Sequence, residues 1–351
     1  MPLTLNAAGD DDGRRLDKIL RKALRELPLS AIHRMLRKGA VLVDGETAAA
    51  ERRIRAGETI TVADAALSQA RDRGAEMEGA SANAAGEKKP AKTRLAAGVV
   101  LYEGAGLLII NKPAGLEVHG RESLEEQVRS YLKPKLPPSL SFRPGPLHRL
   151  DKPSSGIIVF STNLEGARVF SALMRDRKIA KYYLALVEGV IKKAEVWRDE
   201  LIRDRGRNKT FAMDPGAMMV DSSRPSADFV RAAGETTAKT ALTRVSPLAG
   251  NAACTLVRVE IETGRTHQIR AQAAGRGHPL AGDKKYGGRA FSGMPDKSSG
   301  AHSGFLLHAW RMEFPMETPF PRMVQAPLPE YFKRKICGLF GEKVLALIAN
   351  E

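Results

Sequence analysis

The stretch HRLDKPSSG, residues 148–156, leads directly into the apolar run IIVF, residues 157–160. A short apolar run behind a Pro-Ser-Ser-Gly turn predicts a buried strand. The carboxylate of Asp151 lies between this turn and the cation of Arg149. Such a carboxylate is either a candidate nucleophile or half of an ion pair that caps the strand, and this stretch leaves both interpretations open.

Other segments between residues 98 and 351 have the patterns of further strands and helices. We expect strands at 99–102, 107–112, 181–189, 255–261 and 305–314, and helices at 124–132, 163–175 and 328–340. Residues 200–238 are polar and turn-rich, and we expect them to lie outside the sheet. The pattern indicates an α+β fold on a mixed, largely antiparallel sheet. We assign residues 98–351 to this α+β domain.

Residues 1–63 form a separate, smaller unit. Apolar residues at helical spacing predict a helix from Leu16 to Leu27, stopped by Pro28, and a second helix capped by Ser30 that ends at Gly39. A strand at 41–43, an Asp-Gly turn and a returning strand at 60–62 follow. The unit is therefore a helix-helix-hairpin domain.

Its two helices carry charge of one sign. Residues 14–38 include nine Lys or Arg against two acids, a net charge of +7. The core takes the apolar positions, so the cations lie on outer surfaces. Among these cations, Arg15, Lys18, Arg34, Arg37 and Lys38 are expected to contact a polyanionic partner such as RNA.

Residues 64–97 have the composition of a flexible linker. They are rich in Ala, Gly, Ser, Glu and Lys, and as a coil they would span about 30 Å. The two domains could then move independently. A short helix around residues 64–73 is an alternative for part of this segment.

The totals limit the class of protein. The 351 residues carry 56 Lys or Arg and 40 Asp or Glu, a net charge of +16, which favours a polyanionic partner. No apolar stretch is long enough to cross a membrane, and no secretory signal begins the chain. The 2 cysteines have no metal or disulfide spacing and suit a reduced cytoplasm.

Several familiar motifs are absent. The sequence has no Walker-type phosphate loop, no GxGxxG after a strand, no GxSxG elbow and no kinase glycine loop before HRLD. His148, His267, His278 and Asp283 lack the helical spacing of metal ligands, so we expect them to make structural hydrogen bonds. We predict no metal site.

Four segments together resemble the RluA-type pseudouridine synthases. These are LLIINKPAG (107–115), HRLDKPSSGIIVFS (148–161), KYYLALVEG (181–189), and ETGRTHQIRAQ (262–272) with GHPLAGDKKYGG (277–288). Residues 14–63 resemble an S4-like RNA-binding domain, found in the subset that modifies ribosomal RNA, including the large-subunit enzymes. The resemblance implies a sheet with a central cleft, no cofactor, and conversion of uridine to pseudouridine in structured RNA.

The resemblance also assigns the catalytic residues. Asp151 matches the catalytic aspartate, and Arg270 matches the arginine that pairs with it. Tyr183 matches the tyrosine that lies against the target base. Tyr182 is its rival, because neighbours in a strand face opposite sides, and the spacing Lys181-x-Tyr183 favours Tyr183.

Further residues are assigned to the RNA. Arg149 matches the arginine that takes the place of the flipped uridine, with a phosphate contact as the alternative, and His148 is its neighbour in the opened stack. We also assign Arg265, His267 and Gln268 to RNA contact. Many relatives have histidine where this chain has Gln272, so we expect different local hydrogen bonding there.

Three other interpretations remain open from the sequence. They are a catalytically silent RNA-binding ribosome-assembly factor, a synthase acting on transfer RNA, and a metal-dependent RNA nuclease, for which the sequence supplies few ligands. We expect a monomer with RNA as its partner and no protein partner implied. The sequence does not identify the target uridine.

Overall fold

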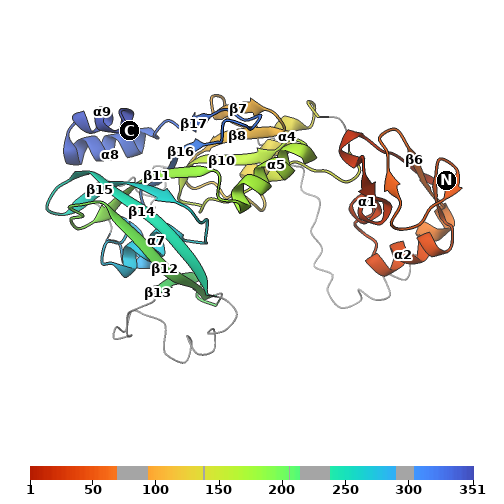
Figure 1. Cartoon of the computed structure of the whole chain (residues 1–351), viewed down its shortest axis with the longest axis horizontal. Helices are drawn as coiled ribbons and strands as arrows, with labels where there is room; N and C mark the ends of the chain where they lie inside the picture. Colours follow the sequence, from red (N-terminus) through yellow and green to blue (C-terminus); the bar gives the residue numbers. More distant parts are fainter. Residues whose placement is uncertain (69–93, 137–138, 205, 214–237, 290–303) are drawn as a thin grey trace. The chain divides into compact units, whose positions relative to one another are not determined.

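The computed structural model describes residues 1–68, 94–136, 139–204, 206–213, 238–289 and 304–351. It forms two compact units: Met1–Arg94 with Gln127–Gly145 and Ser161–Arg168, and Leu95–Glu126 with Pro146–Phe160 and Val169–Glu351. We call them unit 1 and unit 2 (Figure 1). Most of the predicted linker, residues 69–93, lies outside the described residues. Within the described residues, no helix has the length and apolar character needed to cross a membrane.

Unit 1 contains the predicted helix-helix-hairpin domain. Its helices are α1 (Leu16–Ala23) and α2 (Leu29–Arg37), and its main sheet has the order β1 (Leu3–Asn6), β6 (Thr59–Val62), β3 (Val41–Val43) and β4 (Glu46–Thr47). A second pair joins β2 (Arg14–Arg15) to β5 (Arg53–Ile54). The apolar faces of both helices pack on the strands in one core, so the period-based prediction is confirmed.

Two local predictions in unit 1 were wrong, and one strand was missed. Helix α1 ends at Ala23, well before Pro28, because Leu24 already leaves the helical conformation. Pro28, and not Ser30, occupies the N-cap position of α2, since proline is favoured where a helix begins and its preset backbone needs no side-chain cap. Strand β1 was not predicted, because four residues alternating at a chain end give too weak a pattern.

Unit 2 is built on one long mixed sheet. Its order is β13-β12-β14-β15-β11-β16-β10-β8-β7, with β17 beside β16 and β9 beside β10. The strands are β7 (Val100–Gly104), β8 (Leu107–Lys112), β9 (Gly145–Pro146), β10 (Ser155–Ser161), β11 (Ala180–Glu188), β12 (Glu195–Asp204), β13 (Lys209–Met213), β14 (Lys239–Gly250), β15 (Cys254–Ile261), β16 (Leu307–Glu313) and β17 (Met323–Gln325). Neighbours from β13 to β16 pair antiparallel, whereas β10 and β16 pair in parallel, so the predicted mixed, largely antiparallel sheet is confirmed.

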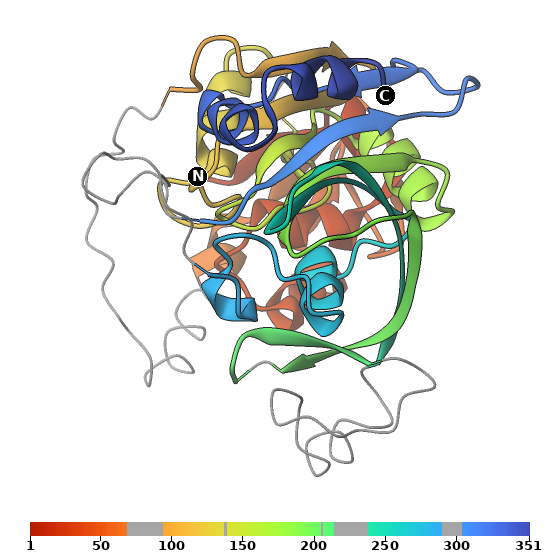
Figure 2. The same ribbon diagram turned by 90° about the vertical axis from the view of Figure 1, so that its left-hand side faces the viewer.

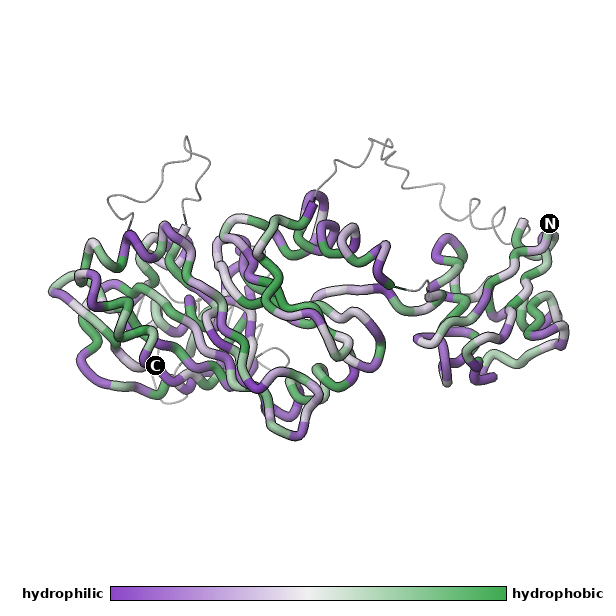
Figure 3. The backbone as a smooth tube through the Cα atoms, turned by 90° about the horizontal axis from the view of Figure 1, so that it is seen from above, coloured by the Kyte–Doolittle hydropathy of each residue, from purple (hydrophilic) through white to green (hydrophobic). Residues whose placement is uncertain are grey.

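Helices cover both faces of the central strands (Figures 1 and 2). Helix α7 (Gln268–Gly275) packs on one face, and α8 (Glu330–Phe340) and α9 (Lys343–Ala349) pack on the other. Helices α4 (Leu124–Leu132) and α5 (Leu164–Arg175) match the predicted ranges within one residue, and each follows a side chain, Ser123 or Asn163, that accepts an amide hydrogen bond from its first turn. Short hydrophobic and hydrophilic stretches alternate along the backbone (Figure 3).

The prediction that residues 200–238 lie outside the sheet was wrong for its described part. Strand β12 runs to Asp204, and β13 pairs with it at the edge of the sheet. Leu201, Ile202 and Phe211 are buried, and the polar residues Asp204 and Thr210 are buried beside them in the same two strands. The polar composition therefore reflects an edge hairpin whose pairing is made by the backbone. Residues 205 and 214–237 lie outside the described residues.

Gly156 allows the close approach of β10 and β16. Its φ is +106°, and a Cβ atom there would lie 2.2 Å from the carbonyl oxygen of Ala309, the residue it opposes. Only glycine fits this position. Gly156, the last residue of HRLDKPSSG, therefore lets β10 pair closely with β16, and this pairing anchors the turn that contains Asp151.

Candidate active site

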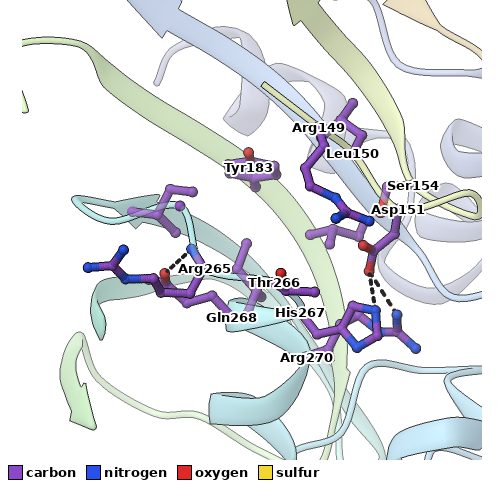
Figure 4. A pocket seen from close by; sticks show the side chains of 14 residues that line it. Arg149, Leu150, Asp151, Ser154, Tyr183, Arg265, Thr266, His267, Gln268 and Arg270 are labelled. Atoms are coloured by element: carbon purple, nitrogen blue, oxygen red, sulfur yellow. Dashed lines mark hydrogen bonds and ion pairs between the residues drawn. The ribbon is translucent and has the colours of Figure 1, made fainter. Parts of the chain in front are cut away.

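Asp151 lies in the turn that enters β10. The amide of Ser154 donates to the carbonyl oxygen of Asp151 at 3.0 Å, which closes the turn. The side chain is 16% exposed, and its Oδ2 accepts a hydrogen bond from Nη1 of Arg270 at 2.7 Å (Figure 4). Oδ1 has no hydrogen bond to another described residue. One carboxylate oxygen is thus fixed and the other is free for a substrate.

Arg270 projects from α7, and its guanidinium is also bound by a second carboxylate, that of Asp283. Its Nε and Nη2 donate to the two oxygens of Asp283 at 2.6 and 2.8 Å. The guanidinium also lies 4.4 Å from the ring centre of Phe305 and 4.9 Å from that of Tyr286. Burial lowers the pKa of Arg270, but Asp283 and Asp151 outweigh it and raise that pKa further above its ordinary value. Arg270 is a fixed cation.

His267 begins α7 in the left-handed conformation, with φ at 54°. Its Nδ1 lies 2.9 Å from the hydroxyl of Tyr286 and its Nε2 lies 3.7 Å from Oδ2 of Asp151. Burial lowers the pKa of His267 to about 4, although the charge of Asp151 opposes the change. Because the Tyr286 hydroxyl and Arg203 both lie on Nδ1 as donors, we assign the proton to Nε2, facing Asp151.

Tyr183 lies on β11, on the same face of the sheet as α7. Burial, and then the negative charge of Asp151, raise the pKa of Tyr183 above 10.0, so its phenol is neutral at physiological pH. Tyr182 packs on the opposite face, beside the core formed by α8 and α9. Strand alternation therefore brings only Tyr183 to the pocket.

A pocket opens beside Asp151 and Tyr183 (Figure 4). Its polar lining comes from the turn before β10, from β11 and from the start of α7: Arg149, Asp151, Ser154, Tyr183, Arg265, Thr266, His267, Gln268 and Arg270. A second hollow also reaches Asp151 and adds the cations Arg203 and Lys285. Residues far apart in the sequence thus meet at one carboxylate.

The predicted RNA-binding residues of unit 2 divide into two groups. Arg149 and Arg265 are exposed side chains that line the pocket, and Arg149 has no ion pair to another described residue. His148 instead accepts a hydrogen bond from the amide of Val159 at 3.0 Å, and burial lowers its pKa to about 4. The Gln268 amide makes all its bonds within the protein. His148 and Gln268 therefore hold the site together.

The predicted RNA-binding cations of unit 1 also differ in their surroundings. Lys18, Arg37 and Lys38 are exposed, and Arg34 is partly buried. Arg15 donates two hydrogen bonds to Asp17, at 3.0 and 3.1 Å, and so is already paired.

Two site residues were not predicted. Asp283 lies in GDKKYGG, where it was assigned only a structural hydrogen bond, and it orients Arg270. Lys112, in LLIINKPAG, is fully buried, and its Nζ donates to the carbonyl oxygens of Pro113, Leu116 and Lys152 at 2.9, 2.8 and 3.1 Å. Burial lowers the pKa of Lys112 to about 7, with Asp151 opposing the change. The sequence signal that could have identified Asp283 and Lys112 was their position inside GDKKYGG and LLIINKPAG, two of the segments that carry the family resemblance.

Gln272 makes three hydrogen bonds within the protein. Its Nε2 donates to Asp199 at 2.6 Å and to the Trp197 carbonyl at 3.2 Å, and its Oε1 accepts from Thr243 at 2.5 Å. It joins α7 to β12 and β14. Within the described ranges, no group of three or more His, Cys, Asp or Glu side chains is placed to hold a metal ion.

Sequence comparison adds the family to this geometry. The model of the RNA pseudouridylate synthase family matches residues 106–275, and that of the S4 domain matches residues 14–60. Ribosomal large subunit pseudouridine synthase C of Escherichia coli K12 is 30% identical over 326 residues, 93% of this chain and 92% of the relative. The chain belongs to the RNA pseudouridylate synthase family. It is therefore an enzyme that acts on RNA.

Two more comparisons agree with this assignment. The protein of the same name from Vibrio vulnificus CMCP6 is 30% identical to this pseudouridylate synthase over 336 residues, 94% of this chain and 95% of the relative. The solved structure of human RNA pseudouridylate synthase domain containing 4 matches with a TM-score of 0.51 and 23% identity, over 66% of this chain and 89% of that one. The second likeness concerns the fold alone.

Proposed function

We propose that this pseudouridylate synthase isomerises uridine to pseudouridine in large-subunit ribosomal RNA. The observation that carries the proposal is the hydrogen bond of 2.7 Å between Arg270 and Asp151 in a pocket also lined by Tyr183. The names of the relatives and the basic N-terminal domain support ribosomal RNA as the substrate. Transfer RNA is the alternative substrate.

The proposed chemistry needs no net oxidation. The bond from N1 of uracil to C1′ of ribose breaks, a bond from C5 to C1′ forms, and the C5 proton leaves while N1 gains one. Asp151 acts as the carboxylate that attacks or stabilises the reacting nucleoside, through the oxygen that Arg270 leaves free. Tyr183 lies against the base, and its neutral phenol assists the removal of the C5 proton by hydrogen bonding or by relaying a proton, not as the base that keeps it.

The remaining residues present the RNA. Arg149, exposed beside the pocket, takes the place of the flipped uridine in the RNA stack, and Arg265 contacts the RNA nearby. We propose that residues 1–63 deliver the enzyme to its RNA, that 64–97 connect the domains and that 98–351 catalyse the reaction. We also propose a cytoplasmic monomer.

The test is tritium release from large-subunit ribosomal RNA labelled at C5 of uridine. We expect release by the wild-type chain and a loss of at least about 10³-fold for Asp151→Asn, which keeps the shape but loses the charge. Transfer RNA labelled in the same way tests the alternative substrate. Undiminished release by Asp151→Asn would refute the proposed role of the carboxylate.

A further inference from the structure

In unit 1, the buried carboxylate of Asp11 connects the helix-helix-hairpin domain to residues 139–141, a distant part of the chain. Asp11 has no exposed surface, and its oxygens accept hydrogen bonds from the amides of Leu140 and Ser141 at 3.1 and 2.9 Å, and from the hydroxyls of Ser139 and Ser141. Burial raises the pKa of Asp11, but these donors outweigh it and lower the pKa below 3.8. An ionised Asp11 therefore fixes residues 139–141.

Two more contacts secure the same junction. Leu140 packs against the core made by α1, α2 and the small sheet. Asp10 accepts a hydrogen bond from the amide of Leu164, at the start of α5, at 2.7 Å. Residues 139–141 and the start of α5 consequently have a defined position beside the core that α1 helps to form, although more than a hundred residues separate them from α1 in the sequence.

This junction brings together cations from both parts. Lys22 and Arg25, at the end of α1, are exposed, as are Arg129 and Arg143 across the junction. Arg14 is partly buried, and its Nη1 donates to the carbonyl oxygen of Ser141 at 3.4 Å. We call these five residues the cationic cradle.

The charges of the cradle lie close enough to act on one another. Burial, and then the cations of Arg14, Arg25 and Arg143, lower the pKa of Lys22. Burial, followed by Arg25 and Arg129, lowers the pKa of Arg143.

Arg129 and Arg143 also line a hollow, together with Lys133 and several hydroxyl groups. The single carboxylate among the described lining residues is Asp10, which already accepts the amide of Leu164. Clustered cations around a hollow with hydroxyl donors favour an anion with several oxygens, such as a phosphate of an RNA backbone.

We propose that the cationic cradle binds consecutive phosphates of the RNA substrate, at a site composed jointly of the cations at and around α1 (Arg14, Lys22 and Arg25) and of Arg129 and Arg143. The proposal rests on the proposed function only in identifying the polyanion as the RNA substrate. The site differs from the helix cations predicted from the sequence, because Arg129 and Arg143 lie outside the helical domain.

The test is RNA affinity of the full chain as a function of salt, measured by fluorescence anisotropy with a folded fragment of large-subunit ribosomal RNA. The cradle variant is Arg25→Gln/Arg129→Gln/Arg143→Gln. Its matched control is Lys192→Gln/Lys193→Gln/Arg198→Gln, which removes the same charge from exposed residues of unit 2. Thermal unfolding checks that both variants fold.

We expect the cradle variant to bind about 10- to 100-fold more weakly at 150 mM salt and to reduce the slope of log affinity against log salt by about 2 to 3. The control should stay within about twofold of wild type. Equal affinities and slopes for the two variants would overturn the cradle.

Two further measurements separate the possible failures. Tritium release by the wild-type chain tests the proposed function independently of RNA affinity. The cradle proposal can therefore be refuted while the proposed function stands, and the proposed function can be refuted while the cradle proposal stands. Asp11→Ala leaves the five cations but frees residues 139–141, so we expect it to weaken RNA binding as well. Wild-type affinity for a folded Asp11→Ala variant would overturn the composite site.

Discussion

Arg270 divides its hydrogen bonds between two carboxylates, with Nε and Nη2 on Asp283 at 2.6 and 2.8 Å and Nη1 on Asp151 at 2.7 Å. Asp283 is 2% exposed and uses both oxygens on the guanidinium. The bidentate contact fixes the plane of Arg270, and this fixes the direction in which Nη1 points. Asp283 therefore positions Asp151 without touching the substrate.

Replacing Asp283 should reduce kcat. In Asp283→Asn one of the two charge-assisted hydrogen bonds to Arg270 is lost, so the guanidinium can turn and Asp151 loses its defined position. We expect kcat to fall about 10- to 100-fold, because small errors in placement have effects of this size, while KM changes little. Single-turnover and steady-state assays of tritium release measure both quantities.

Asp199→Asn is the matched control for this prediction. Asp199 is equally buried and pairs with Arg276 at 2.8 Å, on the side of α7 that faces β12. It should lower stability by a similar amount and leave kcat near that of wild type. If both variants lose kcat equally, the effect of Asp283 is one of folding and not of positioning.

Tyr183→Phe should slow the reaction without weakening RNA binding. The phenol lies beside the pocket, and removing its hydroxyl takes away the group that assists proton transfer from C5. We expect kcat to fall about 10²- to 10⁴-fold, the range typical of general acid–base groups. Tyr182→Phe, on the opposite face of β11, should be almost silent.

The pH dependence gives a second test of Tyr183. Burial and the charge of Asp151 raise its pKa, so the phenol stays protonated throughout the physiological range. Below about pH 10, the pH profiles of kcat for the wild-type enzyme and for Tyr183→Phe should therefore have the same shape. A change of rate with pH that is present in the wild type and absent from Tyr183→Phe in this range would contradict the neutral phenol.

Sequence patterns predicted the fold better than they predicted the site. Buried runs such as residues 157–160 and the helical spacing in α1 were sufficient, because both are local. Strands β12 and β13 escaped prediction because buried polar residues such as Asp204 and Thr210 interrupt the apolar pattern of this hairpin. Its pairing partners are set by the backbone and cannot be inferred from composition.

The site depends on contacts between distant residues. Arg270 and Asp151 are 119 positions apart, and only the family resemblance suggested that they pair. The contact of Asp283 with Arg270 depends on the orientation of α7, a helix that was not predicted. Lys112 lay in a recognised segment, but its three carbonyl acceptors come from loops whose shape the sequence does not show.

Stability should fall as the pH is lowered from 6.5 toward 5. Burial lowers the pKa of His308, as it does those of His148 and His267, to about 4 from 6.5. In this window the unfolded chain binds protons that the folded chain excludes. The stabilisation is therefore complete above about pH 6.5 and is lost on acidification, by up to about 1.4 kcal/mol per pH unit for each histidine.

His308→Gln tests one of these groups. His308 is fully buried between Ser155 and the carbonyl of Ala326, at 2.8 and 3.2 Å. The variant should be less stable at pH 7, and its free energy of unfolding should depend less steeply on pH than that of wild type. Urea titrations at several pH values measure this, and parallel curves for the two proteins would refute the assignment.

Gly156→Ala should be among the most damaging single changes in unit 2. Its Cβ would lie 2.2 Å from the oxygen and 2.6 Å from the nitrogen of Ala309, both of them backbone atoms that cannot turn aside. Gly277→Ala is the matched control, because Gly277 also has a positive φ, +78°, but has no neighbour within 4 Å of that position. The control measures the backbone strain alone.

We expect Gly277→Ala to lower the free energy of unfolding by about 1 kcal/mol, and Gly156→Ala to lower it by about 3 kcal/mol or more. The difference is the cost of separating β10 from β16. Because Asp151 lies in the turn that enters β10, Gly156→Ala should also reduce kcat in the molecules that remain folded. Equal losses of stability in the two variants would show that β10 and β16 can move apart without cost, and the glycine of HRLDKPSSG would then have no special role in placing Asp151.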